Sequence, residues 1–186
     1  MSHTLLALLL IIFTLRIATV VGSIRNVKRM KAMGGVEYGK TNSRYLTLLH
    51  TAFYFGAIFE AMIRQTQWQA LTYVGLGFYL FSMLALALVI YCLWPVWSIK
   101  LVIVPNHQVV ANWLFRAVRH PNYFLNILPE LIGVVLMTQA YFCALILTPL
   151  YLWSLRVRIA QEEKVMRQAC PEYQMLLEGE RKAQPQ

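Results

Sequence analysis

The chain has 186 residues, of which 59% are apolar and only 13% are charged. Soluble domains usually carry about 25% charged residues, so the composition argues against a soluble fold and predicts one integral membrane domain, residues 1–186. The Lys and Arg residues behind the net charge of +9 lie in short segments between apolar runs, unlike the basic stripe with interleaved aromatics of a nucleic-acid surface. The cysteines are widely spaced, which predicts neither a disulfide framework nor a metal site.

Residues 1–94 contain three apolar runs that predict three membrane-spanning helices. Each run is close to the roughly 20 residues that cross a bilayer as a helix. The runs are Thr4–Gly22, Leu46–Ile63 and Ala70–Leu93. The third run has no charged residue, and Pro95 follows it as a helix stop. The polar residues of the second run, His50 and Glu60, are candidates to line the interior, but residues of this kind more often form a satisfied polar pair or lie at the interface.

The remaining residues, 95–186, are predicted to form a cofactor-binding loop, a helical hairpin and a cytosolic C-terminal helix. The apolar stretch from Pro121 to Leu155 is too long for one membrane crossing and slightly short for two. We therefore predict a tight hairpin that bends near Thr138–Gln139–Ala140. With the three earlier spans, this gives an all-α membrane protein of about five transmembrane helices.

Two local patterns flank this hairpin. Before it, Val102–Val104 and the pair Val109 and Val110 lie on either side of Pro105–Asn106, which predicts a short extended hairpin. After it, polar and apolar residues spaced one turn apart predict that the last helix continues past the membrane surface. These residues are Arg158, Glu162 and Met166.

The distribution of Lys and Arg predicts the orientation, because short cytosolic loops carry an excess of both. The segment between the first two runs holds a cluster of basic residues opposed only by Glu37, whereas residues 64–69 hold a single Arg. Lys100, Arg119 and Arg158 then fall on the same side as the basic cluster. We therefore predict a multi-pass protein of the inner or plasma membrane, with its N-terminus outside and its active site facing the cytosol.

A first polar cluster lies immediately before the hairpin, at Arg119, His120, Pro121, Asn122 and Tyr123. Pro121 suits the first position of a helix, where its missing N–H would be unpaired in any case. The free N–H groups and positive dipole of such a helix end favour the anionic group of a ligand. The alternative is a juxtamembrane anchor with Arg and Tyr at the interface, which the spacing alone favours.

A second polar cluster follows the hairpin, at Arg156, Arg158, Glu162 and Glu163. Arg158 and Glu162 are four residues apart on one helical face, so they can form a simple ion pair. A helical hairpin returns the chain to the side it left, however, so the two clusters should lie close together. Two convergent charged clusters at the mouth of an apolar bundle indicate a site for a charged ligand with a lipophilic partner.

These clusters resemble the motif of the isoprenylcysteine carboxyl methyltransferase family. In that family a His and aliphatic residues precede Gly-x-Tyr and Arg-His-Pro-x-Tyr, and an Arg, Glu-Glu and Glu-Tyr follow two helical passes later. The matching residues here are His107, Val109–Val110, Arg119–Tyr123, Arg158, Glu162–Glu163 and Glu172–Tyr173. The resemblance covers about Trp97 to Leu177. Upstream, Gly35–Lys40 looks like the short bacterial branch of the family, some members of which O-methylate alkylpyrones.

The resemblance implies S-adenosylmethionine as the methyl donor. The residues that would line its site are His107, Gln108, Val109, Val110, Phe115, His120, Pro121, Asn122, Tyr123 and Glu162. Arg158 and Arg119 would be catalytic, and Arg158 would also bind the anionic group of the substrate. The Gly-x-Tyr of the family is Trp113-Leu114-Phe115 here, and Lys100 stands where a relative has Gln, so the seating of the cofactor is expected to differ in detail.

We therefore expect an S-adenosylmethionine-dependent O-methyltransferase that acts at the membrane on a lipophilic acidic acceptor, such as a prenylcysteine carboxylate, an alkylpyrone enol or an acidic lipid. Membrane lipid is an expected partner, whereas nucleic acid and metal are not. One alternative is an NADPH-dependent membrane reductase of the sterol-reductase type, for which the loop supplies few of the required basic residues. Another is a non-enzymatic small-molecule transporter, against which the absence of an inverted repeat argues.

Overall fold

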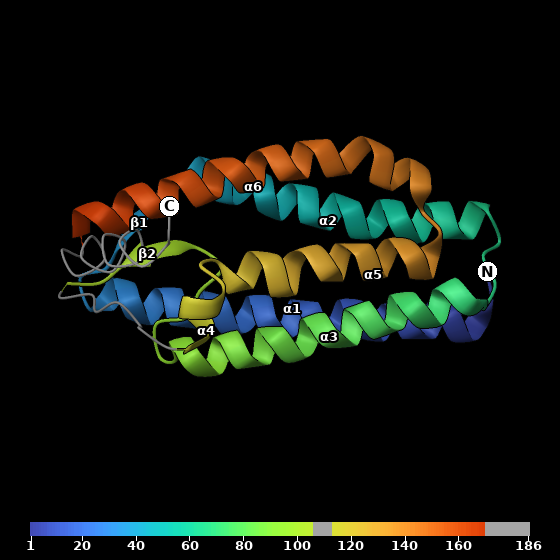
Figure 1. Ribbon diagram of the computed structural model, residues 1–186, viewed down its shortest axis with the longest axis horizontal. Coiled ribbons are helices and arrows are strands. Elements are labelled where there is room, and N and C mark those ends of the chain that lie inside the picture. Colours follow the sequence, from blue (N-terminus) through green and yellow to red (C-terminus); the bar gives the residue numbers. More distant parts are fainter. Residues whose placement is uncertain (106–112, 170–186) are drawn as a thin grey trace, which may run out of the picture.

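Four long helices and a shorter helical arm form the body of the protein (Figure 1). The computed structural model describes residues 1–105 and 113–169, with the backbone alone at 116. The elements in chain order are α1 His3–Ala32, β1 Val36–Tyr38, α2 Lys40–Ile63, α3 Ala70–Leu93, β2 Leu101–Ile103, α4 Trp113–Ala117, η1 Asn122–Ile127, α5 Leu128–Thr138 and α6 Tyr141–Ala169. Within the described ranges, α1, α2, α3 and α6 are long and apolar enough to cross a membrane. The structure is therefore mostly helical, in agreement with the predicted membrane fold.

The boundaries of the first three helices follow the apolar runs to different degrees. The helix α3 matches its predicted range at both ends. The helix α1 continues beyond the run that ends at Gly22, because Val27 and Met30 are buried against Val102 of β2. Packing on another element therefore extends this helix into the basic segment, where hydropathy alone predicts an end.

The predicted hairpin is present, and its bend lies at the expected residues. The helix α5 ends at Thr138, Gln139 adopts a left-handed φ of 55°, and α6 begins at Tyr141. The first arm, Asn122–Thr138, is shorter than the four long helices and combines η1 with α5. The two arms of the hairpin are thus unequal in length.

Glu60 of α2 caps the second arm of the hairpin. Its carboxylate accepts hydrogen bonds from the backbone N–H groups of Phe142 at 3.2 Å and Cys143 at 2.8 Å. These are free donors of the first turn of α6, and a negative charge near a helix N-terminus is stabilising. Glu60 therefore has a structural partner at the bend.

Two glycines allow α3 and α5 to pack closely. A Cβ atom on Gly75 would lie 2.7 Å from the carbonyl oxygen of Gly133, and one on Gly133 would lie 2.7 Å from the carbonyl oxygen of Gly75. Small residues permit such close backbone approach between membrane helices. The buried cluster beside this contact includes Tyr79, Val134 and Met137.

The short strands join two loops that are distant in sequence. β1 and β2 are antiparallel, with Val36 opposite Ile103 and Tyr38 opposite Leu101. The extended segment predicted around Val102 is therefore present, and among the described residues its partner is β1. Val109 and Val110, the expected partners, lie outside the described residues. The pairing could not be read locally, because its two strands are separated by α2 and α3.

An ion-pair cluster reinforces the strand pairing. The side chain of Glu37 on β1 is nearly buried and pairs with Lys31 and, at 2.9 Å, with Lys100. Burial raises the pKa of Glu37, but the hydrogen bonds from Lys31 and Lys100 outweigh burial and hold the pKa below its ordinary value. Glu37 thus links the end of α1 to the loop before β2.

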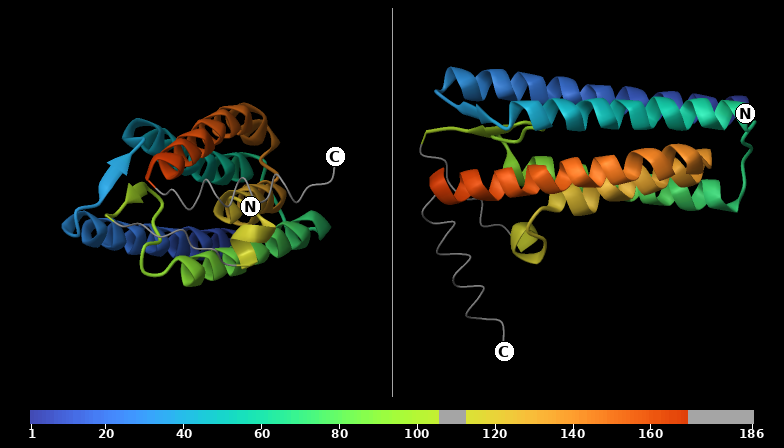
Figure 2. Two further views of the ribbon diagram at one scale, coloured as in Figure 1. Left: turned by 60° about the vertical axis from the view of Figure 1, so that its left-hand side comes forward. Right: turned by 90° about the horizontal axis from the view of Figure 1, so that it is seen from above.

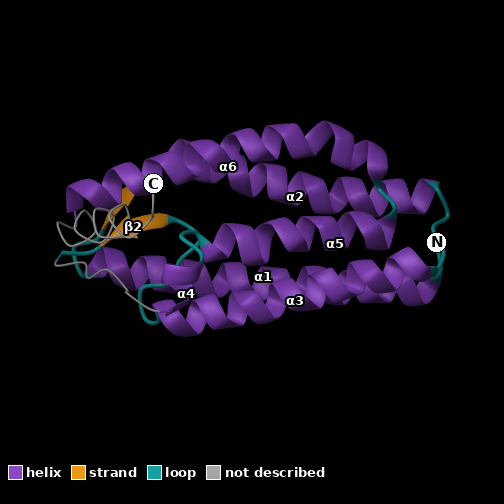
Figure 3. Cartoon of the chain, viewed as in Figure 1, coloured by secondary structure: helices purple, strands orange, loops and turns teal. Residues whose placement is uncertain are grey.

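The two ends of the bundle differ in character. The strands, α4 and the beginning of η1 lie at one end, and the N-terminus lies at the other with the α2–α3 turn (Figure 1). Further views show the long helices running along one common axis (Figure 2), with the loops gathered at the two ends (Figure 3). The basic residues of the α1–α2 connection belong to the strand end, which the charge distribution predicts to be cytosolic.

This orientation can be tested by labelling single cysteines in a variant without the native thiols. Gln67 and Met33 are both exposed, at opposite ends of the bundle. A membrane-impermeant maleimide added to intact cells is expected to label a cysteine at Gln67 and to spare one at Met33. After permeabilisation both should react. Labelling of Met33→Cys in intact cells would show that the strand end faces outside, opposite to the predicted orientation.

Candidate active site

The two polar clusters meet at the strand end of the bundle. The Tyr123 hydroxyl donates a hydrogen bond to Glu162 Oε2 at 2.5 Å. His120 Nδ1 lies 3.5 Å from Glu162 Oε1, and His120 Nε2 lies 3.5 Å from Glu163 Oε1. The hairpin therefore brings both clusters together, as expected from its return across the bundle.

The segment η1 positions the first cluster. Pro121 stands immediately before η1, at the position predicted for a helix start, and His120 accepts backbone hydrogen bonds from Tyr123 and Phe124. The turn is a π-helix rather than the expected α-helix. Such turns are rare and are frequently found at functional sites. Here the buried side chains of η1 are Tyr123 and Asn126.

Arg158 is a buried cation at the centre of this arrangement, with 3% of its surface exposed. Its guanidinium donates to the Tyr123 hydroxyl at 3.2 Å, to Ser43 Oγ at 2.8 Å and to the Ile99 carbonyl at 2.9 Å. These bonds tie α6 to η1, α2 and the loop before β2, and they occupy three of the five guanidinium N–H groups. Tyr123 thus connects Arg158 to Glu162, a relationship different from the simple ion pair that their spacing suggests.

His120 carries a proton more readily than an ordinary histidine. Burial lowers the pKa of His120, but the hydrogen bonds and negative charges of Glu162 and Glu163 outweigh burial and raise the pKa above its ordinary value. The ring also stacks on Tyr123, with centroids 5.8 Å apart. The cluster therefore favours a cationic imidazole between two carboxylates.

The raised pKa of His120 predicts a pH-dependent stability. The stabilisation by protonated His120 should be complete below its unfolded pKa of about 6.5 and lost as the pH rises through the raised folded value. The Tm difference between wild type and His120→Gln in detergent is therefore expected to shrink as the pH rises above about 6.5. A difference that grows over this range would show that the neutral imidazole is the stabilising form.

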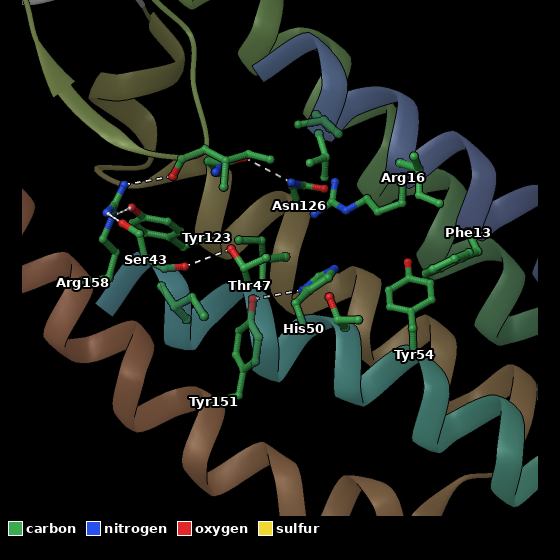
Figure 4. Close-up of a pocket in the computed structure, with 18 of the residues that line it drawn as sticks. Phe13, Arg16, Ser43, Thr47, His50, Tyr54, Tyr123, Asn126, Tyr151 and Arg158 are labelled. Carbon is green, nitrogen blue, oxygen red and sulfur yellow. Dashed lines mark hydrogen bonds between the residues drawn. The ribbon is translucent and has the colours of Figure 1, made fainter. Parts of the chain in front are cut away.

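A cavity of about 240 Å³ extends from Arg158 into the bundle (Figure 4). Four polar residues of α2, spaced four, three and four residues apart, share one face of the helix and line one wall: Ser43, Thr47, His50 and Tyr54. At 1.5 Å per residue this wall is about 16 Å long. Apolar side chains line much of the rest of the cavity, among them Phe13, Ile17, Leu86 and Ile127. The cavity can therefore accept an elongated, largely apolar molecule.

The wall ends deep in the bundle at a charged cluster. Glu130 of α5 is fully buried and forms an ion pair with Arg16 of α1 at 2.7 Å. Tyr54 donates a hydrogen bond to Glu130 Oε1 at 2.6 Å, and His50 Nε2 lies 3.4 Å from the same oxygen. Charged residues inside membrane bundles normally face one another or a polar cavity, and this cluster does both.

The sequence singled out His50 only as a polar residue of the second run, and it did not indicate its partners Glu130 and Tyr151, whose hydroxyl lies 3.1 Å from His50 Nδ1, or the contribution of Tyr54. One signal was present. Arg16 and Glu130 have opposite charges and lie in two different apolar runs. Charged residues inside a membrane bundle usually pair with each other.

The other residues with a predicted role are placed as follows. Phe115 of α4 is half-buried and packs against the cluster that contains Trp97 and Leu114. Arg119 is exposed between α4 and η1. Outside the described residues lie His107, Gln108, Val109 and Val110. Among the residues that are described, no group of three His, Cys, Asp or Glu side chains has a metal-binding arrangement.

Comparison with known proteins gives a family match over residues 74–168, a little more than half of the chain. The matching model is that of the isoprenylcysteine carboxyl methyltransferase family, and its range contains both polar clusters. The chain belongs to this family. Membership in this family indicates that the protein is a membrane methyltransferase.

Two bacterial relatives share most of this family member's length. An uncharacterized protein of Haemophilus influenzae is 46% identical over 149 residues, which cover 80% of this chain and 87% of the relative. The uncharacterized protein YpbQ of Bacillus subtilis is 26% identical over 165 residues, 87% of this chain and 95% of the relative. No solved structure matches the chain. The family match begins within α3, so α1 and α2, which supply Arg16, Ser43 and His50, lie outside it.

Proposed function

We propose that this methyltransferase transfers a methyl group from S-adenosylmethionine to an oxygen of a lipophilic acidic acceptor. The observation that carries the proposal is the position of Arg158. Its buried guanidinium borders the cavity and is joined through Tyr123 to the carboxylate of Glu162. A cation that can hold an anionic acceptor thus lies beside groups that suit the amino-acid end of the methyl donor.

The polar groups around η1 fit the amino-acid portion of S-adenosylmethionine. Glu162 and Glu163 provide carboxylates for an α-ammonium group, and a protonated His120 suits the α-carboxylate. His120 Nδ1 lies at 3.5 Å from Glu162 Oε1, a long contact that leaves room for a shorter bond to a ligand. When bound, the cofactor supplies a methyl group already activated by a positively charged sulfur.

Arg158 would orient the acceptor. Three of its N–H groups hold the guanidinium in place and two remain for a ligand. A planar guanidinium binds carboxylates and related anions through two parallel hydrogen bonds, and it favours the ionised oxygen that methyl transfer requires. Fixed alignment and exclusion of water are the main contributions that a protein makes to such a displacement.

The cavity accounts for the membrane location. Its apolar lining suits a hydrocarbon tail, while Arg158 lies at the strand end, which the charge distribution predicts to face the cytosol. In this arrangement the acceptor enters from the lipid phase and the water-soluble cofactor from the cytosol. The two substrates would meet at Tyr123 and Arg158.

The cofactor assignment can be tested with two neighbouring glutamates. Both contact His120, but Glu162 also accepts a hydrogen bond from Tyr123, whereas Glu163 pairs with Arg167. In calorimetric titrations, Glu162→Gln is expected to weaken S-adenosylhomocysteine binding about tenfold to hundredfold, since a hydrogen bond to a charged group contributes roughly 1.5–3 kcal/mol. Glu163→Gln should lose less of its affinity for S-adenosylhomocysteine. NADPH is the control ligand and should not bind.

Unchanged affinity in Glu162→Gln would remove this residue from the cofactor site. Saturable NADPH binding by the wild type, without binding of S-adenosylhomocysteine, would replace the methyltransferase proposal by a reductase.

A further inference from the structure

Most polar groups along the cavity are satisfied by the protein itself. Thr47 donates its hydroxyl hydrogen to the Ser43 carbonyl at 2.9 Å, and Ser43 Oγ accepts from Arg158. Tyr54 is bonded to Glu130, and His50 Nδ1 lies within hydrogen-bond distance of Tyr151. These groups already have hydrogen-bond partners within the protein, so they do not need a ligand to satisfy them.

Asn126 is an exception. Its side chain lines the cavity (Figure 4) and is 1% exposed. Asn126 Nδ2 donates to Asn122 Oδ1 at 3.1 Å, but Asn126 Oδ1 has no hydrogen-bond partner in the described part of the chain. Exchanging nitrogen and oxygen in both amides preserves the bond and still leaves one polar atom of Asn126 unpaired. A buried polar atom without a partner is unfavourable, so a ligand group or water is required.

The unpaired group lies at a defined depth. Asn126 follows Tyr123 by three residues on η1, which places it further along the helix axis than Tyr123. Tyr123 marks the position of Arg158 through their hydrogen bond. His50 Nε2, on the same cavity, is instead paired with Glu130 Oε1 at 3.4 Å. Beyond Arg158, the cavity therefore offers a polar group that can bind a polar part of a ligand.

We propose that Asn126 binds a hydroxyl group that the methyl acceptor carries on its chain, beyond its reacting anion. A hydroxyl can both donate and accept, so it satisfies Asn126 in either orientation of the amide. This inference rests on the proposed function, because it takes Arg158 as the site of the reacting anion. It assigns the acceptor to hydroxylated lipophilic acids rather than to acids with an unsubstituted hydrocarbon chain.

Two acids of equal chain length test the proposal. Binding of 3-hydroxydecanoate and decanoate is measured on purified wild-type protein saturated with S-adenosylhomocysteine. The hydroxy acid is expected to bind about tenfold more tightly, which corresponds to one net hydrogen bond of about 1.4 kcal/mol. In Asn126→Leu, which has a similar shape, the two affinities should become equal through weaker binding of the hydroxy acid. Thr47→Val is the matched control, because this hydroxyl already has a partner, and it should keep the preference.

Equal affinities in the wild type would overturn the inference without any variant, as would a preference that persists in Asn126→Leu. Methyl transfer from S-adenosylmethionine is measured separately. Equal binding of both acids together with transfer to both would reject the hydroxyl site and leave the proposed function in place. An Asn126-dependent preference without transfer to either acid would support the hydroxyl site and count against the proposed function.

Discussion

Arg158→Lys is expected to lower methyl transfer to a lipophilic acid by at least tenfold, while S-adenosylhomocysteine affinity stays within a few-fold. Lysine keeps the charge but lacks the planar, two-pronged geometry of the guanidinium. It also cannot reach Tyr123, Ser43 and the Ile99 carbonyl together while presenting two further N–H groups to a ligand. A tenfold loss corresponds to about 1.4 kcal/mol of transition-state stabilisation.

Ser43→Ala provides the control for this prediction. It removes one support of the guanidinium but leaves the guanidinium itself in place, so transfer should fall less than in Arg158→Lys. Normal transfer by Arg158→Lys would show that Arg158 is only structural. Equal losses of transfer and of S-adenosylhomocysteine affinity would instead place Arg158 in the cofactor site.

Gly75→Ala should destabilise the protein by about 1–3 kcal/mol or more, because overpacking a close contact displaces backbone. The added Cβ would lie 2.7 Å from the Gly133 carbonyl oxygen and 2.7 Å from the Met137 nitrogen, and neither is the end of a flexible side chain. The change would push α3 away from α5, which leads through η1 to the site. We therefore expect a clearly lower Tm in detergent and a loss of cofactor binding.

Gly77→Ala is the matched control on the same helix. A Cβ at Gly77 meets no atom within 4 Å, and alanine favours a helix over glycine by up to about 1 kcal/mol. Its Tm should equal or exceed that of the wild type. Equal Tm values for Gly75→Ala and Gly77→Ala would show that α3 and α5 are not held by the glycine contact.

The features that the sequence determined by itself depend on local composition. The charge-free run Ala70–Leu93 became α3 without a change of boundary, since an uninterrupted apolar segment and a following proline specify a membrane helix locally. The bend at Gln139 and the helix start at Pro121 were likewise predicted from the length of the apolar stretch and from residue type. The proximity of His120 to Glu162 followed from the hairpin alone, because a chain that turns back must return to the same end.

Only the tertiary structure decided which distant residues share an environment. The pairing of β1 with β2, the contact of Ser43 with Arg158 and the ion pair of Arg16 with Glu130 each join segments separated by at least one helix. Hydropathy places each residue on a helix but does not fix the rotation of that helix about its axis. Packing of the helices against one another fixes it. The cavity and the unpaired amide of Asn126 are products of that packing.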